Sequence, residues 1–502
     1  MHQLFSNESM LSKLKLLAKD SAIYGASTVL SRGLNYILVP LYANLLTPEA
    51  NGIQTVIYAN IAFANVLFTY GMETAYMKFA ADAKNDGGLV ARYFSTAFLS
   101  LLLSSLLFSS AIALGAPSVA TLIGLDESAA MFIRYSAIIL LLDTLAVIPL
   151  ADLRLQRKAV QFAIVRVGGV LAIVVSTMAF LLVLNMDLEG AFLGNIVGSA
   201  LSFLLLLPSW RTLKILFAQN LWKELLSLGL PYVPTGITGL LIRLIDRNIL
   251  IRVPDEKVHA LYPMPLTSAE MVGIYGRVVA FGLLAQLLVQ VFRFAWQPFF
   301  LQHASDTDAK KLFSKILTIS SVGILVISFA AALFVPLLIQ VHFFHKFYLL
   351  PPAFWIGLPI LPVIFFSFMF EVISTNLSAG ILIEKKTGYL PIVSAVGAGL
   401  TVALCIPLSW EYGMMGAAIA TTAGTIAMAA AMYHFSQKVY PNTYEWGKIG
   451  GLFTIAVGLY AIPAYFEAGI WLRLLAFGGF LVAFVFLFKN EFSQIHARLK
   501  RR

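Results

Sequence analysis

The sequence predicts an all-α polytopic membrane protein of about fourteen transmembrane helices, built as two parallel-repeat six-helix lobes plus two C-terminal helices. Three observations predict this fold class. Hydrophobic residues make up 59% of the 502 residues and charged residues only 12%, whereas a soluble domain carries about 25% charged residues. Apolar runs of about 20 residues, the length that crosses a bilayer, recur along the whole chain. Segments in the two halves of the chain also align with one another.

The apolar runs set the positions of the expected spans. Gly and Pro interrupt many of them, which membrane helices tolerate when neighbouring groups satisfy the freed backbone. The expected spans lie near 20–45, 52–78, 91–115, 130–151, 159–184, 190–209, 225–251, 271–301, 312–339, 353–383, 388–408, 413–436, 447–466 and 469–488.

Internal repetition divides these spans into two lobes. The aligned segments are 46–68 with 267–288 (offset 221), 157–169 with 385–397 (offset 228) and 189–202 with 415–428 (offset 226). An even number of helices in each lobe gives both the same orientation, so the repeats are parallel. The expected divisions are an N-lobe at 1–209, an amphipathic cytoplasmic linker at 210–224, a C-lobe at 225–436, two helices at 437–488 and a basic cytoplasmic tail at 489–502.

The basic residues predict the orientation in the membrane. With both termini in the cytoplasm, 24 of the 35 Lys and Arg residues fall in cytoplasmic segments and 4 on the opposite side. This asymmetry is what the positive-inside rule requires. The net charge of +10 is therefore explained by topology and gives no reason to expect nucleic acid.

Seven arginines fall within the spans, where a charge costs about 2.5–3.5 kcal/mol on insertion scales. Arg243, Asp246 and Arg247 are spaced i, i+3 and i+4, so we expect them on one face of the seventh span with a net positive charge. The eighth span carries Arg277 and Arg293, which lie about 160° apart on an ideal helix and face one cavity only if the helix bends. Charged residues within membrane-spanning helices usually face the interior of the helix bundle or a water-filled cavity, so we expect these arginines to do so.

Polar residues of the first, second, fourth, seventh, eighth and tenth spans complete the candidate set. The candidate anion-binding residues are Arg32, Arg243, Arg247, Arg293 and Arg277, the candidate ion-coupling carboxylates are Asp20, Glu73, Asp143, Asp246 and Glu371, and the candidate cavity amides are Asn35, Asn65, Gln286 and Gln290. A purely structural interpretation stays open for some of them. Asp143 can form an inter-helix pair with Arg166, and Glu73 and Glu371 can be protonated and merely hydrogen-bonded.

The sequence shows no signature of an enzyme. It lacks His/Cys metal spacing, a Gly-rich phosphate loop with lysine, and a nucleophile beside a base. The one cysteine, Cys405, lies in an apolar run, so no internal disulfide is possible. We expect no cofactor, although a coupling ion, H⁺ or Na⁺, has carboxylates to bind to.

Three stretches resemble a known family: VPLYANLLTPEANGIQ (39–54), LPYVPT with IDRNIL in the seventh span, and VGIYGRV with FAWQPF in the eighth. They are similar to polysaccharide flippases of the multidrug/oligosaccharidyl-lipid/polysaccharide exporter superfamily, the Wzx-like O-antigen and capsule transporters. The resemblance implies a MATE-like fold that moves undecaprenyl-diphosphate-linked oligosaccharide across the bacterial cytoplasmic (inner) membrane by alternating access. It also implies a cationic central cavity, at positions corresponding to Arg32, Arg243, Arg247 and Arg293. Arg277 departs from the pattern, because a less charged residue is expected there.

Other functions were weighed against this one. A flippase for the peptidoglycan precursor shares the fold and the charge logic. A MATE-type cation or drug antiporter would need an acidic, aromatic pocket, and a membrane-embedded glycosyltransferase or polymerase would need a larger extracytoplasmic loop than this chain has. The expected partners are a lipid-linked oligosaccharide, the bilayer, and the polysaccharide polymerase and chain-length machinery; we expect a functional monomer and no nucleic acid.

Overall fold

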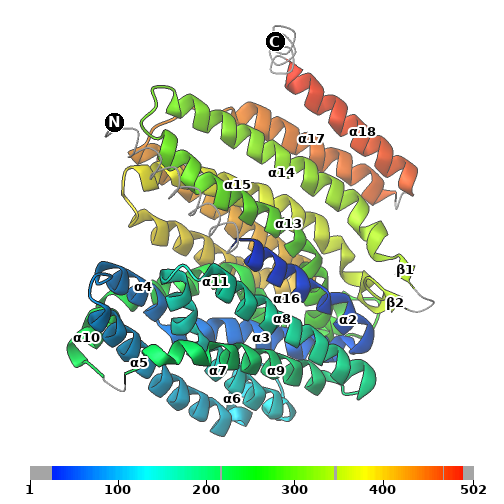
Figure 1. Cartoon of the computed structure of the whole chain (residues 1–502). Coiled ribbons are helices and arrows are strands. Elements are labelled where there is room, and N and C mark those ends of the chain that lie inside the picture. Colours follow the sequence, from blue (N-terminus) through cyan, green and yellow to red (C-terminus); the bar gives the residue numbers. More distant parts are fainter. Residues whose placement is uncertain (1–24, 215–216, 344–346, 467–468, 490–502) are drawn as a thin grey trace. The chain divides into compact units, whose positions relative to one another are not determined.

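Helices dominate the computed structural model, which describes residues 25–214, 217–343, 347–466 and 469–489 (Figure 1). Asp20, one of the candidate carboxylates, and both ends of the chain lie outside these residues. The chain forms two compact units. The first is Met1–Leu240 with Thr267–Gly273, and the second is Leu241–Leu266 with Ile274–Arg502. Such units follow spatial contacts rather than sequence repeats, so the expected lobes and linker stay predictions.

The first unit is a bundle around one central helix, α7. Ahead of the first labelled helix, residues 25–36 are helical. The elements are α2 (Leu38–Leu45), α3 (Pro48–Thr69), α4 (Met72–Asp82), α5 (Gly87–Leu114), α6 (Ala116–Leu122), η1 (Glu127–Ala129), α7 (Ala130–Leu155), α8 (Ala159–Met178), η2 (Ala179–Val183), α9 (Leu188–Leu206), η3 (Leu207–Thr212) and α10 (Gln219–Gly229). Helix α7 packs on α3, α4, α5, α8 and α9, and 72% of its most apolar window is buried inside the protein. Its neighbours therefore surround it.

Local sequence explains where several helices begin. Thr47 accepts a hydrogen bond from the backbone N–H of Ala50 at 3.1 Å, and Pro48 follows at the first helical position of α3. Asp86 caps α5 in the same way through the N–H of Leu89 at 3.0 Å. Each cap satisfies a backbone donor that the helix itself leaves unpaired.

Two broken helices of the first unit meet at their breaks. The span Pro48–Asp82 is interrupted between α3 and α4, where Gly71 has φ +71°. The span Gln219–Leu250 is interrupted between α10 and α11 (Tyr232–Leu250), where Pro231 lies. A Cβ on Gly71 would lie 2.1 Å from the carbonyl oxygen of Gly229, so only glycine permits this approach. Helix α10 packs on α4 and α5 (Figure 1).

The second unit is also helical, apart from one short hairpin. Its elements are the end of α11, α12 (Asp255–Leu261), most of α13 (Ser268–His303), α14 (Ala309–Ile339), β1 (His342–Phe343), β2 (Phe347–Tyr348), η4 (Pro352–Ile360), α15 (Leu361–Ile383), α16 (Tyr389–Val439), α17 (Trp446–Tyr465) and α18 (Ile470–Leu487). The strands pair antiparallel, with His342 opposite Tyr348. Helix α15 lies between α14 and α16, and α17 and α18 pack on α14.

Helix α16 contains two spans joined without a loop. Its 51 residues would measure about 75 Å as one helix, far more than the roughly 30 Å of a bilayer core. At Gly413 the backbone leaves the helical conformation (φ 55°, ψ −129°). The N–H of Met414 donates to the Tyr262 hydroxyl at 2.8 Å, which fixes the turn.

Glycines aligned by the internal repeat occupy equivalent helix contacts. In the first unit, a Cβ on Gly198 of α9 would lie 2.6 Å from the carbonyl oxygen of Gly169 on α8. In the second unit, a Cβ on Gly424 would lie 2.8 Å from the carbonyl oxygen of Gly397, both on α16. These are the residues that offsets 226 and 228 pair in the sequence. Both units therefore use the same close crossing of two antiparallel spans.

The predicted fold class, an all-α polytopic membrane protein, is confirmed. Among the described residues, eleven helices or joined helices are long and apolar enough to cross a membrane, or twelve if the bent α13 counts as one span. Two differences account for the remainder of the expected fourteen. The break at Gly413 makes two spans of α16, and the expected first span begins within residues 1–24, outside the described part.

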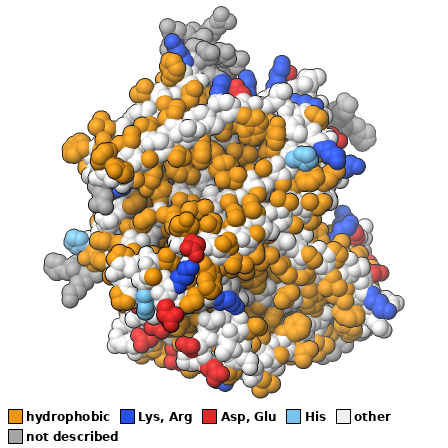
Figure 2. Space-filling view, turned by 180° about the vertical axis from the view of Figure 1, so that it is seen from behind, with side chains coloured by type: hydrophobic (Ala, Val, Ile, Leu, Met, Phe, Trp, Pro, Cys, Tyr) orange, Lys and Arg blue, Asp and Glu red, His pale blue; other side chains and the backbone are white. Residues whose placement is uncertain are grey.

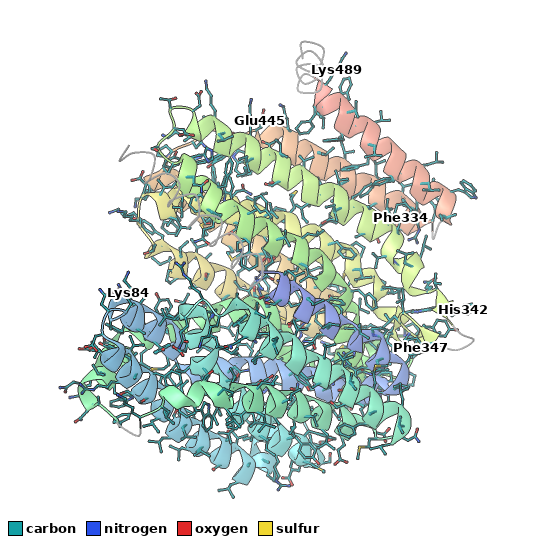
Figure 3. The ribbon with its side chains drawn as sticks, viewed as in Figure 1. Lys84, Phe334, His342, Phe347, Glu445 and Lys489 are labelled. Atoms are coloured by element: carbon teal, nitrogen blue, oxygen red, sulfur yellow. The ribbon has the colours of Figure 1, made fainter. Side chains whose placement is uncertain are left out.

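The surface of the protein suits a lipid environment. Hydrophobic side chains cover broad areas of the face in Figure 2, and large ones such as Leu107 and Phe486 are mostly exposed. Within the second unit, Glu445 and Lys489 lie at one end of the helices, and Phe334, His342 and Phe347 lie toward the other (Figure 3). This is the arrangement expected if the hairpin lies opposite the cytoplasmic side, and the membrane side itself stays a prediction.

Candidate functional site

Two arginines of the second unit share one carboxylate. Glu371 on α15 accepts hydrogen bonds at the same oxygen, Oε1, from Nη2 of Arg243 at 2.9 Å and from Nη2 of Arg293 at 3.2 Å. Arg243 lies on α11 and Arg293 on α13, so three helices supply the cluster. Three of the candidate residues from the sequence are thus brought together, and one negative charge meets two positive ones.

The three side chains differ in exposure. The Arg243 and Arg293 side chains are 50% and 48% exposed, whereas that of Glu371 is 12% exposed. Glu371 is therefore the most buried of the three side chains, and the two arginine side chains are partly accessible. An anion that approached this surface would meet the arginines first.

Asp246 and Arg247 form a separate, buried group with Tyr275 of α13. Asp246 Oδ1 accepts from the backbone N–H of Arg247 at 2.9 Å and from its Nη1 at 2.6 Å, and Oδ2 accepts from the Tyr275 hydroxyl at 2.6 Å. Arg247 Nη1 also donates to the carbonyl oxygen of Arg243 at 2.5 Å. Both charged residues are buried and the pair is electrically balanced. The expected shared positive face is therefore split, since Arg243 points to Glu371 while its neighbours pack inward.

The two arginines of α13 lie on different halves of a bent helix. The segments Ser268–Gly282 and Gln286–His303 meet at 43°, as the sequence required for a shared cavity. Arg277 is nevertheless buried at 9% exposure, whereas Arg293 is about half exposed. Gln286 and Gln290 are half-buried on the same segment as Arg293.

The candidates of the first unit fall into separate places. Arg32 and Asn35 are exposed on the helix 25–36, and Asn65 is half-buried on α3. Glu73 of α4 forms an ion pair with Arg154 of α7. The pairing was not foreseen, because α7 runs to Leu155, beyond the expected end of the span at 151. For the same reason the candidate residues do not include buried Asp152, which accepts from the Tyr76 hydroxyl at 2.7 Å and from Gln156 Nε2 at 2.6 Å.

Asp143 takes part in a polar chain within the membrane-spanning region. It accepts from the Ser199 hydroxyl at 2.7 Å and interacts electrostatically with Arg166. On the same helix as Ser199, Asn195 donates to the Tyr58 hydroxyl at 2.8 Å. The structural interpretation of Asp143 and Arg166 therefore has support.

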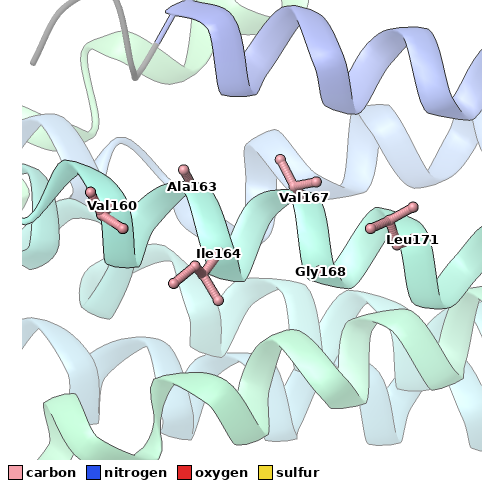
Figure 4. A pocket seen from close by; sticks show the side chains of 6 residues that line it. All are labelled: Val160, Ala163, Ile164, Val167, Gly168 and Leu171. Atoms are coloured by element: carbon pink, nitrogen blue, oxygen red, sulfur yellow. The ribbon is translucent and has the colours of Figure 1, made fainter. Parts of the chain in front are cut away.

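A shallow apolar groove of about 480 Å³ lies along α8 (Figure 4). Its lining is hydrophobic throughout and consists of Val160, Ala163, Ile164, Val167, Gly168 and Leu171. Such a surface suits an acyl chain and offers nothing to a charged head group. Among the described residues, no group of three His, Cys, Asp or Glu side chains could hold a metal ion.

Comparison with known proteins identifies the family and the fold. Residues 17–304 match the family model described as polysaccharide biosynthesis protein. The chain belongs to this family. No curated protein matches the sequence. Membership of the polysaccharide biosynthesis protein family agrees with the resemblance found in the sequence.

Several solved structures share the fold of this family member. The lipid II flippase MurJ in an inward closed conformation aligns with a TM-score of 0.74 at 15% identity, over 93% of this chain and 99% of MurJ. An inward-facing multidrug resistance MATE family transporter of the MOP superfamily aligns with a TM-score of 0.64 at 13% identity, over 83% and 94%. A eukaryotic MATE transporter aligns with a TM-score of 0.51 at 15% identity, over 85% and 98%. At these identities the likeness establishes the fold.

Proposed function

We propose that the protein is a flippase for a polyprenyl-diphosphate-linked oligosaccharide, with undecaprenyl diphosphate as the expected carrier. It moves this lipid from the cytoplasmic to the opposite leaflet by alternating access, for assembly of a cell-surface polysaccharide. The observation that carries the proposal is the half-exposed arginine pair, Arg243 and Arg293, which shares a single carboxylate. Membership of the polysaccharide biosynthesis protein family supports the glycan.

The sign of the charge favours an anionic substrate. Two guanidinium groups against Glu371 leave an excess positive charge among membrane-spanning helices. Arginine presents a planar fork of donors that matches phosphate oxygens two at a time. A cation would be repelled by the same cluster, which argues against a MATE-type drug antiporter. The chemistry proposed is transport without bond breaking, so the protein is not an enzyme and needs no cofactor.

The remaining candidates have subsidiary roles in the proposal. Arg32, exposed on the helix 25–36, is a further contact for the anionic head group. Glu73, Asp143, Asp246 and Glu371 are the carboxylates proposed for coupling to H⁺ or Na⁺. Each has an arginine beside it, Arg154 for Glu73, Arg166 for Asp143, Arg247 for Asp246 and Arg243 for Glu371, so a coupling cation would compete with that arginine. Arg247 and Arg277 are buried and serve the fold in the conformation seen here.

The setting follows from the same proposal. We place the protein in the bacterial cytoplasmic membrane with both termini in the cytoplasm, active as a monomer. Its product is the substrate of the polysaccharide polymerase and chain-length machinery.

A flipping assay in proteoliposomes tests the proposal. The probe is undecaprenyl diphosphate carrying one fluorescent N-acetylglucosamine, and a membrane-impermeant quencher reports the fraction in the outer leaflet. We expect the protein to equilibrate the probe, and Arg243→Ala/Arg293→Ala to abolish this while Arg134→Ala does not. Arg134 is an exposed arginine of α7 and serves as the matched control.

Three further substrates separate the alternatives. Undecaprenyl monophosphate tests the need for the diphosphate, a fluorescent lipid II tests the peptidoglycan precursor, and a quaternary ammonium dye tests cation export. Transport of the dye alone would refute the proposal. Preference for lipid II over the short-glycan probe would assign the protein to peptidoglycan instead.

A further inference from the structure

The geometry of the arginine pair assigns a second role to Glu371, which rests on the proposed function. We propose that Glu371 is an exchangeable counter-anion: its carboxylate occupies Arg243 and Arg293 when no substrate is bound, and the diphosphate of the substrate displaces it. Glu371 is thus a competitor for the site and a positioning residue for the two arginines.

The contacts of Glu371 are those of a weak occupant. A single oxygen, Oε1, accepts from both arginines, and each arginine uses one nitrogen, Nη2. Each guanidinium has five N–H donors in a fixed fork. A diphosphate presents several oxygens on two phosphorus centres and can engage both forks in the paired geometry that a shared carboxylate oxygen does not provide. Exchange therefore replaces one carboxylate oxygen shared by the two arginines with a separate phosphate group for each arginine.

The depth of the groups gives the exchange a direction. The Glu371 side chain is 12% exposed, and the side chains of both arginines are about half exposed. An incoming anion can reach the arginines from the surface without first removing Glu371. When the anion dissociates, the Glu371 carboxylate lies close enough to form its ion pairs with the two arginines again.

The buried Asp246–Arg247 pair of the same unit shows the contrasting arrangement. Asp246 uses both oxygens, for Arg247 and for the Tyr275 hydroxyl, and neither charged residue is exposed. That pair is balanced and closed, and no external anion can replace its acceptor. The Glu371 cluster is open and carries one positive charge in excess, so of these two groups it is the one with the properties of an exchangeable site.

The exchange would also release a link between helices. Glu371 connects α15 to α11 through Arg243 and to α13 through Arg293. Displacement of the carboxylate frees both connections in the same event. Binding of the head group is thereby coupled to loosening of three helices in the second unit.

Removing the charge of Glu371 tests the proposal. Purified protein in nanodiscs is titrated with the undecaprenyl diphosphate probe used above to obtain Kd, and the flipping rate is measured in proteoliposomes as a function of probe concentration. We expect Glu371→Gln to lower the Kd about tenfold or more, because a negative charge facing an anionic ligand opposes its binding. KM should fall with Kd. The maximal rate should also fall, because the variant lacks the carboxylate that pairs with the two arginines again when the substrate dissociates.

Controls separate this role from a structural one. Glu411→Gln makes the same change in the exposed ion pair with Lys257 and should leave Kd and rate unchanged. Glu371→Asp keeps the charge and should return Kd toward the wild-type value. A Glu371→Gln protein that is folded by size-exclusion chromatography yet binds the probe no more tightly than wild type would overturn the counter-anion role.

A second variant keeps the test sharp if Glu371→Gln alone does not fold. Arg293→Gln lowers the net charge of the cluster from +1 to zero, and Arg293→Gln/Glu371→Gln restores +1. We expect the double variant to bind the probe more tightly than Arg293→Gln. Equal or weaker binding would contradict the exchange. Wild-type protein that binds no diphosphate lipid would overturn the proposed function itself, an outcome distinct from the others.

Discussion

Gly52 and Gly273 face each other across the crossing of α3 and α13, and each lies against a backbone carbonyl of the other helix. A Cβ on Gly52 would lie 1.8 Å from the oxygen of Ala269, and a Cβ on Gly273 would lie 1.9 Å from the oxygen of Pro48. Both pairs are related by the offset of 221 residues, so the crossing is symmetric about the internal repeat. All four residues belong to the first compact unit.

This crossing leaves no room for a methyl group. We expect Gly52→Ala and Gly273→Ala each to lower the thermal stability of the detergent-solubilised protein, because the clash is with backbone and the helices must separate. Overpacking of a tight contact costs about 1–3 kcal/mol or more. Gly450→Ala on α17, which meets nothing within 4 Å, is the control and should be neutral or slightly stabilising. Equal melting temperatures for all three variants would show that the crossing adapts.

The arginine pair should matter for transport more than for folding. Loss of a hydrogen bond to a charged group costs about 1.5–3 kcal/mol, so Arg243→Ala or Arg293→Ala should slow flipping about tenfold or more. Each single variant leaves Glu371 with one partner, and the melting temperature should change little. The flipping rate and the melting temperature of the same preparations check both parts. Full transport by both variants would remove the pair from the site.

Asp246 and Arg247 should show the reverse behaviour. Breaking a buried ion pair costs about 3–5 kcal/mol, because the remaining charge stays buried without a partner. We therefore expect Arg247→Ala and Asp246→Asn to reduce the yield of folded protein and its melting temperature. Lys257→Ala, which opens an exposed pair, is the comparison and should cost at most about 1 kcal/mol. A stable Arg247→Ala protein that fails to transport would return Arg247 to the binding site.

The Tyr76 hydroxyl should stabilise the first unit through Asp152. Tyr76→Phe leaves the buried carboxylate with Gln156 as its remaining side-chain partner, and an unmet buried acceptor costs about 1–3 kcal/mol. Tyr135→Phe removes a similar bond to Glu189 in a less buried setting and should cost less. The melting temperatures of the two variants give the comparison, and a larger loss for Tyr135→Phe would be inconsistent with this ranking.

Periodicity and composition were enough to predict the helical fold, while the contacts of the charged residues depended on tertiary structure. Helical spacing placed Arg243, Asp246 and Arg247 on one face, yet Arg243 turns to Glu371 on α15 and its neighbours to Tyr275 on α13. Those partners lie 128 and 29 residues away, and a single sequence contains no signal for either pairing.

The predicted ends of helices also differ from those in the structure, and this affects which residues were chosen as candidates. Arg154 and Asp152 lie just past residue 151, the expected end of the fourth span, so the predicted span leaves both of them out. Polar residues at the edge of an apolar run fit a loop and a buried helix end equally well. The bend of α13 could be considered from the sequence, because Arg277 and Arg293 lie about 160° apart on an ideal helix and can face one cavity only if the helix bends.

The turn at Gly413 limits how the topology of this protein can be mapped. Tyr262 receives the N–H of Met414, and a Cβ on Gly413 would lie 2.2 Å from the Tyr262 hydroxyl oxygen. An epitope tag, a protease site or a reporter inserted between the two halves of α16 would have to push this hydroxyl aside. The segment around the hairpin of β1 and β2 joins α14 to η4 instead of two halves of one helix, so it is the better position for a label that tests the predicted topology.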